Sequence, residues 1–144
     1  MSTIEQDIQT KGLTAPRITP ADIEANIASE HYFTAADGVL GAYKNNNDVR
    51  VETYKPDWEV PRSIQASELL TFCVLVLRNG FTVTGESACT SPENFDAEIG
   101  RKIARSNAVQ KIWPLMGYEL RTNLSTPVIT EADAAADLAG DPRP

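Results

Sequence analysis

The segment from Leu69 to Leu120 constrains the fold most, because its hydrophobic pattern changes from strand-like to helix-like without a long break. Its first part, Leu69–Leu77, is apolar at nearly every position and rich in β-forming residues, which favours a central strand over an edge strand. Asn79-Gly80 predicts a two-residue hairpin turn, since both turn positions need positive φ. We expect Phe81–Thr84 to return as the paired strand.

A long helix is predicted to follow this hairpin. Ser91 is a favoured N-cap residue, and Pro92 fits the first helical position. We expect the helix to run to about Ile112 and to be ended by Pro114, which cannot continue the hydrogen-bond ladder. Gly117–Leu120 is then predicted to turn into a last short strand.

The predicted helix has two apolar faces. At about 100° per residue, one face carries large side chains and should cover the sheet: Phe95, Ile99, Val109 and Trp113. The second face carries small residues: Ala97, Gly100, Ala104 and Ala108. A helical glycine costs roughly 1 kcal/mol relative to alanine, so Gly100 indicates close approach of another backbone, from a second subunit or from the N-terminal helix. Earlier in the chain, Gly85 marks either a bulge or the end of a strand.

The sequence as a whole predicts an α+β fold, in which a small antiparallel sheet packs against one long helix. Thr19-Pro20 predicts the start of an N-terminal helix that runs to Glu30 or His31, and 36–38 reads as a turn. We expect a flexible arm at 1–18, a single domain at 19–124 and a disordered tail at 125–144. Within the domain, 43–63 is predicted to be a loop or a hairpin insertion, with a half-exposed strand near Val49–Tyr54.

Composition and motifs exclude several classes of function. The 144 residues carry a formal charge of −7, with 13 Lys and Arg against 20 Asp and Glu, which argues against a nucleic-acid polymer as partner. The longest apolar run is too short to span a bilayer. One His and two Cys supply no four-ligand metal set, and no phosphate-binding glycine loop or nucleophile elbow is present. We expect no metal, no cofactor, no catalytic residue and no enzymatic activity.

Three consecutive rings, His31-Tyr32-Phe33, form the first candidate binding feature. At a helix end they can supply a stacking surface with a polar handle. The alternative is structural, with Phe33 in the core and His31 closing the helix through its dipole.

Cations on the long helix form the second candidate feature. Arg101 and Arg105 lie one turn apart, so their guanidinium groups could converge on a phosphate, joined by Arg78 if the hairpin folds back. The alternative is a set of surface salt bridges, from Glu98 to Arg101 or Lys102. At the helix start, Asn94 lies beside free backbone N–H groups, which can receive an anion. Its amide could instead read a base edge, or merely help to cap the helix.

Several of these motifs, taken in order, resemble a family of small tailed-phage and prophage proteins. The resemblance rests on N-G-F, S-A-C, P-x-N-F-D, E-x-G and I-W-x-x-x-G-Y, together with the segment TPADIEANIASEHYFTAADG, and covers about half of the chain. The family includes Thoeris anti-defence proteins, which sequester a cyclic ADP-ribose-type immune signal without degrading it. The resemblance therefore implies a cyclic nucleotide ligand, either of the cyclic ADP-ribose type or a cyclic oligonucleotide. It also implies assembly as a homodimer or homohexamer and a location in the cytoplasm of the infected bacterial host.

The resemblance also implies roles for individual residues. Phe81 or Phe95, together with Tyr32, would stack on the ligand, and Asn94 would contact the base or ribose. Three arginines would bind phosphate: Arg78, Arg101 and Arg105. Phe95 also belongs to the large apolar face of the helix, so it cannot freely serve both purposes. The competing function is binding and inhibition of a host protein, with Tyr54 and Trp58 as anchors.

Overall fold

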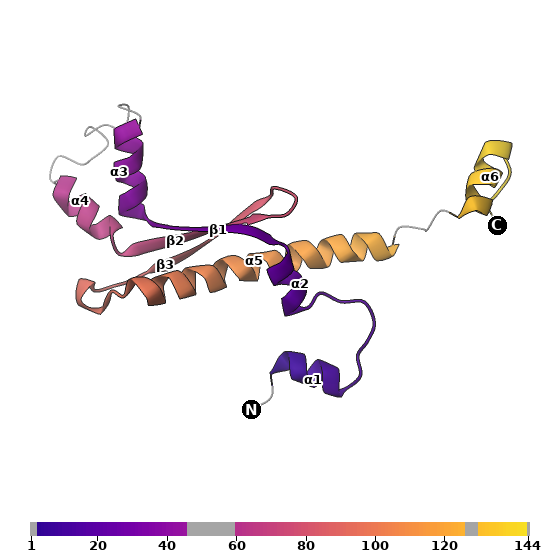
Figure 1. The fold of residues 1–144 in the computed structure, drawn as a ribbon, viewed down its shortest axis with the longest axis horizontal. Coiled ribbons are helices and arrows are strands. Elements are labelled where there is room, and N and C mark those ends of the chain that lie inside the picture. Colours follow the sequence, from indigo (N-terminus) through magenta and orange to yellow (C-terminus); the bar gives the residue numbers. More distant parts are fainter. Residues whose placement is uncertain (1–2, 46–59, 126–129, 144) are drawn as a thin grey trace.

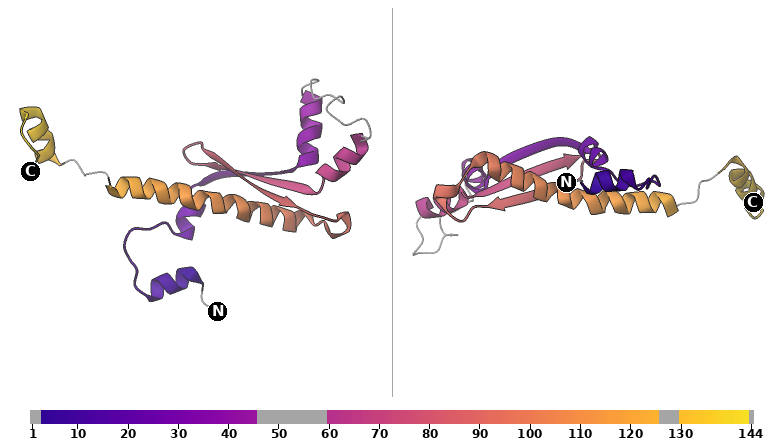
Figure 2. Two further views of the ribbon diagram at one scale, coloured as in Figure 1. Left: turned by 180° about the vertical axis from the view of Figure 1, so that it is seen from behind. Right: turned by 90° about the horizontal axis from the view of Figure 1, so that it is seen from below.

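The computed structural model describes residues 3–45, 60–125 and 130–143. Three strands form an antiparallel sheet in the order β1-β2-β3, and α5 lies along one of its faces (Figures 1 and 2). This architecture confirms the predicted α+β fold. In chain order the elements are α1 (Ile4–Thr10), α2 (Pro20–Ala25), β1 (Ile27–Thr34), α3 (Ala35–Asn45), α4 (Val60–Ser67), β2 (Leu70–Leu77), β3 (Thr82–Ala88), the 3-10 turn η2 (Pro92–Asn94), α5 (Ala97–Ser125) and α6 (Glu131–Ala139).

The apolar strand β2 lies in the centre of the sheet, as its composition predicts. Its residues alternate between buried and half-buried, so that one side packs against α5 while the other is only partly covered. The hairpin is where Asn79-Gly80 predicts it, but its loop has three residues rather than two. Leu77 donates its N–H to the Phe81 carbonyl at 2.8 Å, and only Gly80 has a positive φ, of 88°. In three-residue hairpin loops the last loop residue typically adopts the left-handed conformation, and here that residue is Gly80.

Gly85 neither ends a strand nor forms a bulge; it lies inside β3, directly beneath α5. A Cβ atom at this position would lie 2.0 Å from the Ala104 carbonyl oxygen and 2.3 Å from the Ala108 nitrogen. The two backbones therefore touch where a side chain would otherwise separate them.

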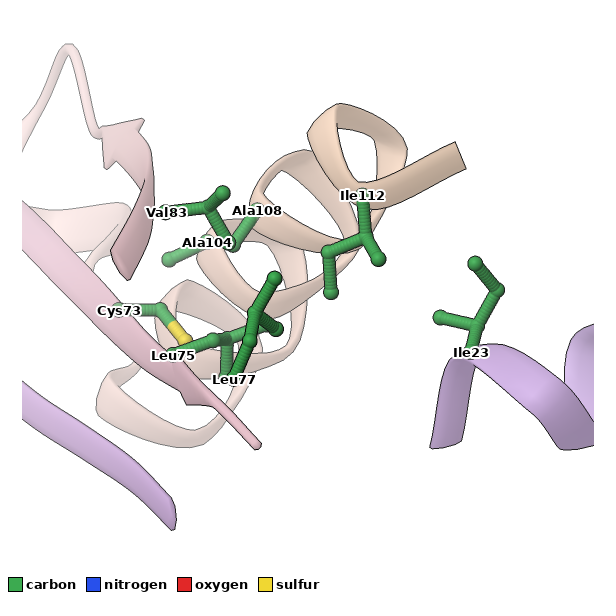
Figure 3. Close-up of a cluster of buried hydrophobic side chains, with 8 residues drawn as sticks. All are labelled: Ile23, Cys73, Leu75, Leu77, Val83, Ala104, Ala108 and Ile112. Atoms are coloured by element: carbon green, nitrogen blue, oxygen red, sulfur yellow. The ribbon is translucent and has the colours of Figure 1, made fainter. Parts of the chain in front are cut away.

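This close approach decides which side of α5 faces the sheet. Ala104, Ala108 and Ile112 are fully buried on α5, where they meet apolar residues of the sheet and of α2 (Figure 3): Ile23, Cys73, Leu75, Leu77 and Val83. The predicted assignment of the two helix faces is wrong. The small-residue face packs against the protein's own sheet, because only small side chains fit above Gly85.

The large apolar face of α5 is correspondingly less buried than predicted. Ile99 is 57% exposed, while Phe95, Val109 and Trp113 are half-buried. Gly100 is buried too, with Thr71 Oγ1 lying 3.1 Å from its Cβ position. The backbone approach that Gly100 was expected to serve, from a second subunit or from the N-terminal helix, is instead a contact with β2.

The boundaries of the long helix also differ from prediction. Pro92 opens only the 3-10 turn, and the capping residue of α5 is Asp96, whose carboxylate accepts from the Ile99 N–H at 2.9 Å. Pro114 lies inside α5, which continues through 117–120 where a strand was predicted. The residues after Pro114 are mostly strong helix formers, and one missing hydrogen bond does not outweigh them.

At the N-terminal side, the capping residues Thr19 and Asp22 start α2 as expected, but the helix ends at Ala25. The following residues form β1, so the predicted continuation to His31 is wrong. The segment 36–38 belongs to α3 rather than to a turn, because Thr34 and Asp37 cap that helix reciprocally, with distances of 3.0 and 3.1 Å.

A short capped helix lies near each end of the chain, α1 within the predicted arm and α6 within the predicted tail. α1 and α6 each begin with a Thr in a capping box. The limits of the arm, domain and tail stay predictions. In the 43–63 segment, the first residues end α3 and the last begin α4; the expected strand at 49–54, with Tyr54 and Trp58, lies outside the described residues.

Candidate functional site

Two hollows meet at Phe95, beside the first turns of α5. The larger encloses about 300 Å³ between the end of β3 and α5, and its walls include Asn94, Phe95 and Ile103. The smaller encloses about 100 Å³, and its lining includes Tyr32, Phe95 and Arg101, together with Phe33 and the acidic Asp37. Phe95 is a wall of both. The structure therefore brings together four of the residues expected to bind ligand.

The four side chains come from three elements of the fold: β1, the 3-10 turn η2 with the residue after it, and α5. Tyr32 pairs with Cys73 in the sheet, so the alternation of β1 turns it toward α5. Asn94 ends the 3-10 turn, and Phe95 follows it immediately in extended conformation. Arg101 lies in the second turn of α5, one residue after the buried Gly100.

Arg101 is the cation of this site. Its side chain is exposed, and no residue in the described part of the chain forms an ion pair or a hydrogen bond with it. Lys102 differs, because its ammonium lies 3.2 Å from Glu98, one turn earlier. The predicted salt bridge thus forms at Lys102 and leaves Arg101 available.

Arg105 does not converge with Arg101. Its guanidinium binds two carboxylates, with Nη2 2.7 Å from Glu24 and Nε 3.1 Å from Glu30. These hydrogen bonds hold the pKa of each carboxyl group below its usual value and raise the pKa of the arginine. The group ties α2 and β1 to α5 and lines neither hollow.

The Tyr32 hydroxyl belongs to the same network. It donates to Glu30 Oε2 at 2.6 Å. Burial raises the pKa of Tyr32 well above its ordinary value, and the bond to Glu30 raises it further, so the phenol stays neutral. The ring of Tyr32 lines the smaller hollow, while its hydroxyl is hydrogen-bonded to Glu30.

Arg78 and Phe81 lie at the other end of β2. Arg78 donates from Nε to the Ala25 carbonyl at 3.0 Å, and Phe81 is 54% exposed next to the hairpin turn. Neither lines the hollows at Phe95. The structure does not bring these two predicted residues to the site.

The three consecutive rings belong to a strand, and two of them, Tyr32 and Phe33, line the smaller hollow. They lie in β1, where His31 and Phe33 point to the face opposite Tyr32. Phe33 stacks on Phe72 with ring centroids 5.6 Å apart, and it is 38% exposed. Both expectations placed this cluster at a helix end, and that placement is wrong, because the three rings lie in β1.

Sequence reasoning missed Glu24 and Glu30. A signal for Glu30 was present: it precedes Tyr32 by two residues, so a strand assignment would have put both on one face. The pairing of Glu24 with Arg105 spans 81 positions of sequence and had no local signal.

Two absences can be stated for the described residues. No three metal-ligating side chains gather at one point in residues 3–45, 60–125 and 130–143. No helix in those ranges combines the length and the apolar content needed to cross a bilayer.

Residues 18–124 match the model of a phage protein family. This range begins just before α2 and ends with the last turn of α5, so it includes the whole sheet and every residue of the site described above. No curated protein and no solved structure matches the chain. Because the matched range covers more than half of its length, the chain belongs to the phage protein (N4 Gp49/phage Sf6 gene 66) family.

Proposed function

We propose that this phage protein binds a cyclic nucleotide immune signal and sequesters it without cleaving it, in the cytoplasm of the infected bacterial host. The ligand is of the cyclic ADP-ribose type or a cyclic oligonucleotide, and its capture blocks Thoeris-type immunity. One observation carries the proposal: two rings, an amide and a guanidinium without an ion-pair partner among the described residues line the two hollows that share Phe95 (Tyr32, Phe95, Asn94 and Arg101).

These groups match the parts of a cyclic nucleotide. Stacking of a base on a ring contributes about 1–3 kcal/mol, and an arginine binds a phosphate through paired hydrogen bonds. The Asn94 amide offers both a donor and an acceptor to a base edge or a ribose. None of these groups is a nucleophile with an adjacent base, which supports retention rather than turnover.

Self-association is part of the proposal. A nanomolar ligand needs roughly −12 kcal/mol of binding free energy, which favours a site enclosed on all sides. The hollows of about 100 and 300 Å³ are small for a dinucleotide. A second subunit would add the missing wall. The distal part of α5 supports such contacts, since Leu115, Tyr118 and Leu124 are exposed.

The direct test is retention of ligand. The full chain is incubated with cyclic ADP-ribose isomers or cyclic oligonucleotides, freed of excess ligand and denatured by heat. We expect the released ligand to be unchanged by mass and chromatography. A chemically altered ligand would indicate an enzyme, and no retained ligand would contradict the proposal.

Two neighbouring cations provide a matched pair of variants. Arg101→Ala should reduce retention at least tenfold, because it removes the one cation that lines the smaller hollow in the described part of the chain. Lys102→Ala removes the adjacent charge, which is bound to Glu98 and lines neither hollow. Equal retention by both variants would show that long-range charge, rather than contact at the site, binds the ligand.

Binding of a host protein is the second candidate function. The exposed Leu115, Tyr118 and Leu124 favour it as much as they favour self-association. If the protein retains no nucleotide, and its distal helix is required for inhibition of a host protein in a purified system, this second function replaces the first.

A further inference from the structure

We infer that Glu30 and Arg105 are positioning residues, which hold the ring of Tyr32 as a wall of the ligand site and do not touch the ligand themselves. This inference rests on the proposed function. It also gives Arg105 a role different from phosphate binding.

The geometry forms a continuous chain from α5 to the site. Arg105 donates to Glu30 from Nε and Nη2, at 3.1 Å for each shortest contact. Glu30 accepts in turn from the Tyr32 hydroxyl at 2.6 Å. One carboxylate thus receives bonds from a guanidinium and a phenol. Both neighbours restrict its rotamer, and through it the orientation of the ring.

Glu24 anchors the other side of the guanidinium. Its two oxygens lie 3.0 and 2.7 Å from Nη1 and Nη2 of Arg105. The fork is therefore bound on two sides, and its direction is fixed by α2 and by β1 together. Among the described residues, Glu24 forms no hydrogen bond with Tyr32. Both carboxylates therefore bind Arg105, but only Glu30 also binds Tyr32.

The consequence for the ligand is specific. The hydroxyl proton of Tyr32 is donated to Glu30, so the phenol has no donor left for a ligand. A ligand at the smaller hollow therefore meets the ring by stacking, while its phosphate goes to Arg101. The hydroxyl contributes by fixing the ring rather than by contact.

Glu30→Ala and Glu24→Ala form the matched pair that tests this inference. Each removes one of the two carboxylates on Arg105, and only Glu30→Ala releases Tyr32. The affinity of the full chain for cyclic ADP-ribose is measured by calorimetry, with unfolding measured in parallel. We expect Glu30→Ala to weaken binding about tenfold, as for loss of a hydrogen bond to a charged group, and Glu24→Ala to stay within about twofold.

Two further variants separate positioning from simple stability. Glu30→Gln keeps an oxygen that accepts from Tyr32, so it should recover most of the affinity lost in Glu30→Ala. Tyr32→Phe should weaken binding in the natural background and have no further effect in the Glu30→Ala background. This non-additivity is the signature of two residues that act as a unit.

The outcomes distinguish this inference from the proposed function. If the natural chain binds cyclic ADP-ribose while Glu30→Ala and Glu24→Ala behave alike, or if Tyr32→Phe and Glu30→Ala are additive, the positioning role is contradicted and the function stands. If the natural chain binds neither cyclic ADP-ribose nor its isomers nor cyclic oligonucleotides, the function fails and the inference fails with it.

Discussion

The two halves of α5 differ in burial: the buried residues of the helix, Gly100, Ala104, Ala108 and Ile112, lie in the first half or at its end. In the half that follows Ala97, the fully buried residues are mainly small, such as Ala104 and Ala108, while the larger Ile99 is 57% exposed. In the half that follows Ile112, the helix runs past the sheet (Figure 1) and large residues such as Leu115 and Tyr118 are exposed. Burial along this helix is therefore set by how closely the sheet approaches, and hydrophobicity alone does not predict it.

This difference in burial gives the two halves of α5 different roles. The first half packs against β3 without the usual layer of side chains, which fixes the start of α5 against the sheet and with it the geometry around Phe95. The second half is left with apolar surface that its own chain does not cover. We expect changes in the first half to alter stability, and changes in the second half to alter association.

Gly85→Ala should have the largest effect. The added methyl group would lie 2.0 Å from the Ala104 carbonyl oxygen, so α5 must move away from β3. We expect a loss of at least about 3 kcal/mol in the free energy of unfolding, measured by urea titration. The control is Gly117→Ala, where no atom lies within 4 Å of the new Cβ. Gly117→Ala should raise the free energy of unfolding by up to about 1 kcal/mol. Similar losses of stability in both variants would contradict the close packing of α5 at Gly85.

Ile112→Ala should have the next largest effect. Ile112 is fully buried where α5 meets α2 and the sheet, and truncation of such a side chain costs about 2–5 kcal/mol. Leu115→Ala, three residues later, removes a side chain that is 41% exposed and should cost less than about 0.5 kcal/mol. Thermal and urea unfolding measure both. A larger loss for Leu115→Ala would mean that the distal half of α5 is covered in solution.

Acidification should weaken the attachment of α2 and β1 to the first half of α5. Arg105 lowers the pKa of Glu24 and Glu30, so their contribution is present above the ordinary carboxyl pKa of 4.5 and is lost as the pH falls below it. Because both carboxylates are partly exposed, we expect at most about 1 kcal/mol. The measurement compares the natural chain with Arg105→Gln at about pH 7 and about pH 3.5. An equal stability difference at the two pH values would contradict this linkage.

Replacing Leu115 and Tyr118 together with Ser should have the smallest effect on stability, within about 0.5 kcal/mol. Both side chains are exposed, so the isolated fold loses little. If the distal half of α5 mediates self-association, the sedimentation coefficient should fall to that of a single chain. The matched control is the exposed Lys102→Ala in the first half of α5. An unchanged assembly would place the interface elsewhere.

Local patterns predicted those parts of the fold that have local causes. The central strand follows from its continuous apolar run, the hairpin from Asn79-Gly80, and the start of α2 from Thr19 and Asp22. The same patterns failed at β1. Its polar and apolar residues, Ile27–Thr34, resemble a helix that continues from α2, and pairing with β2 overrides this propensity.

The candidate site was predictable to a similar extent. Tyr32, Asn94, Phe95 and Arg101 meet as expected, since three of them lie close together in sequence around the start of α5. The grouping failed for Arg78 and Phe81, which the hairpin carries to the far end of β2. It also failed for Arg105, whose partners are 75 and 81 positions away in the sequence.

The amino-acid sequence by itself determined the α+β class, the central strand, the hairpin position and the existence of a long helix, because each depends on short-range periodicity and turn chemistry. Only the tertiary structure decided which face of α5 is buried and which cations remain unpaired. These features depend on the contact between Gly85 and α5 and on ion pairs between distant segments. A local sequence pattern contains no information about these contacts, because they form only when elements far apart in the sequence pack together.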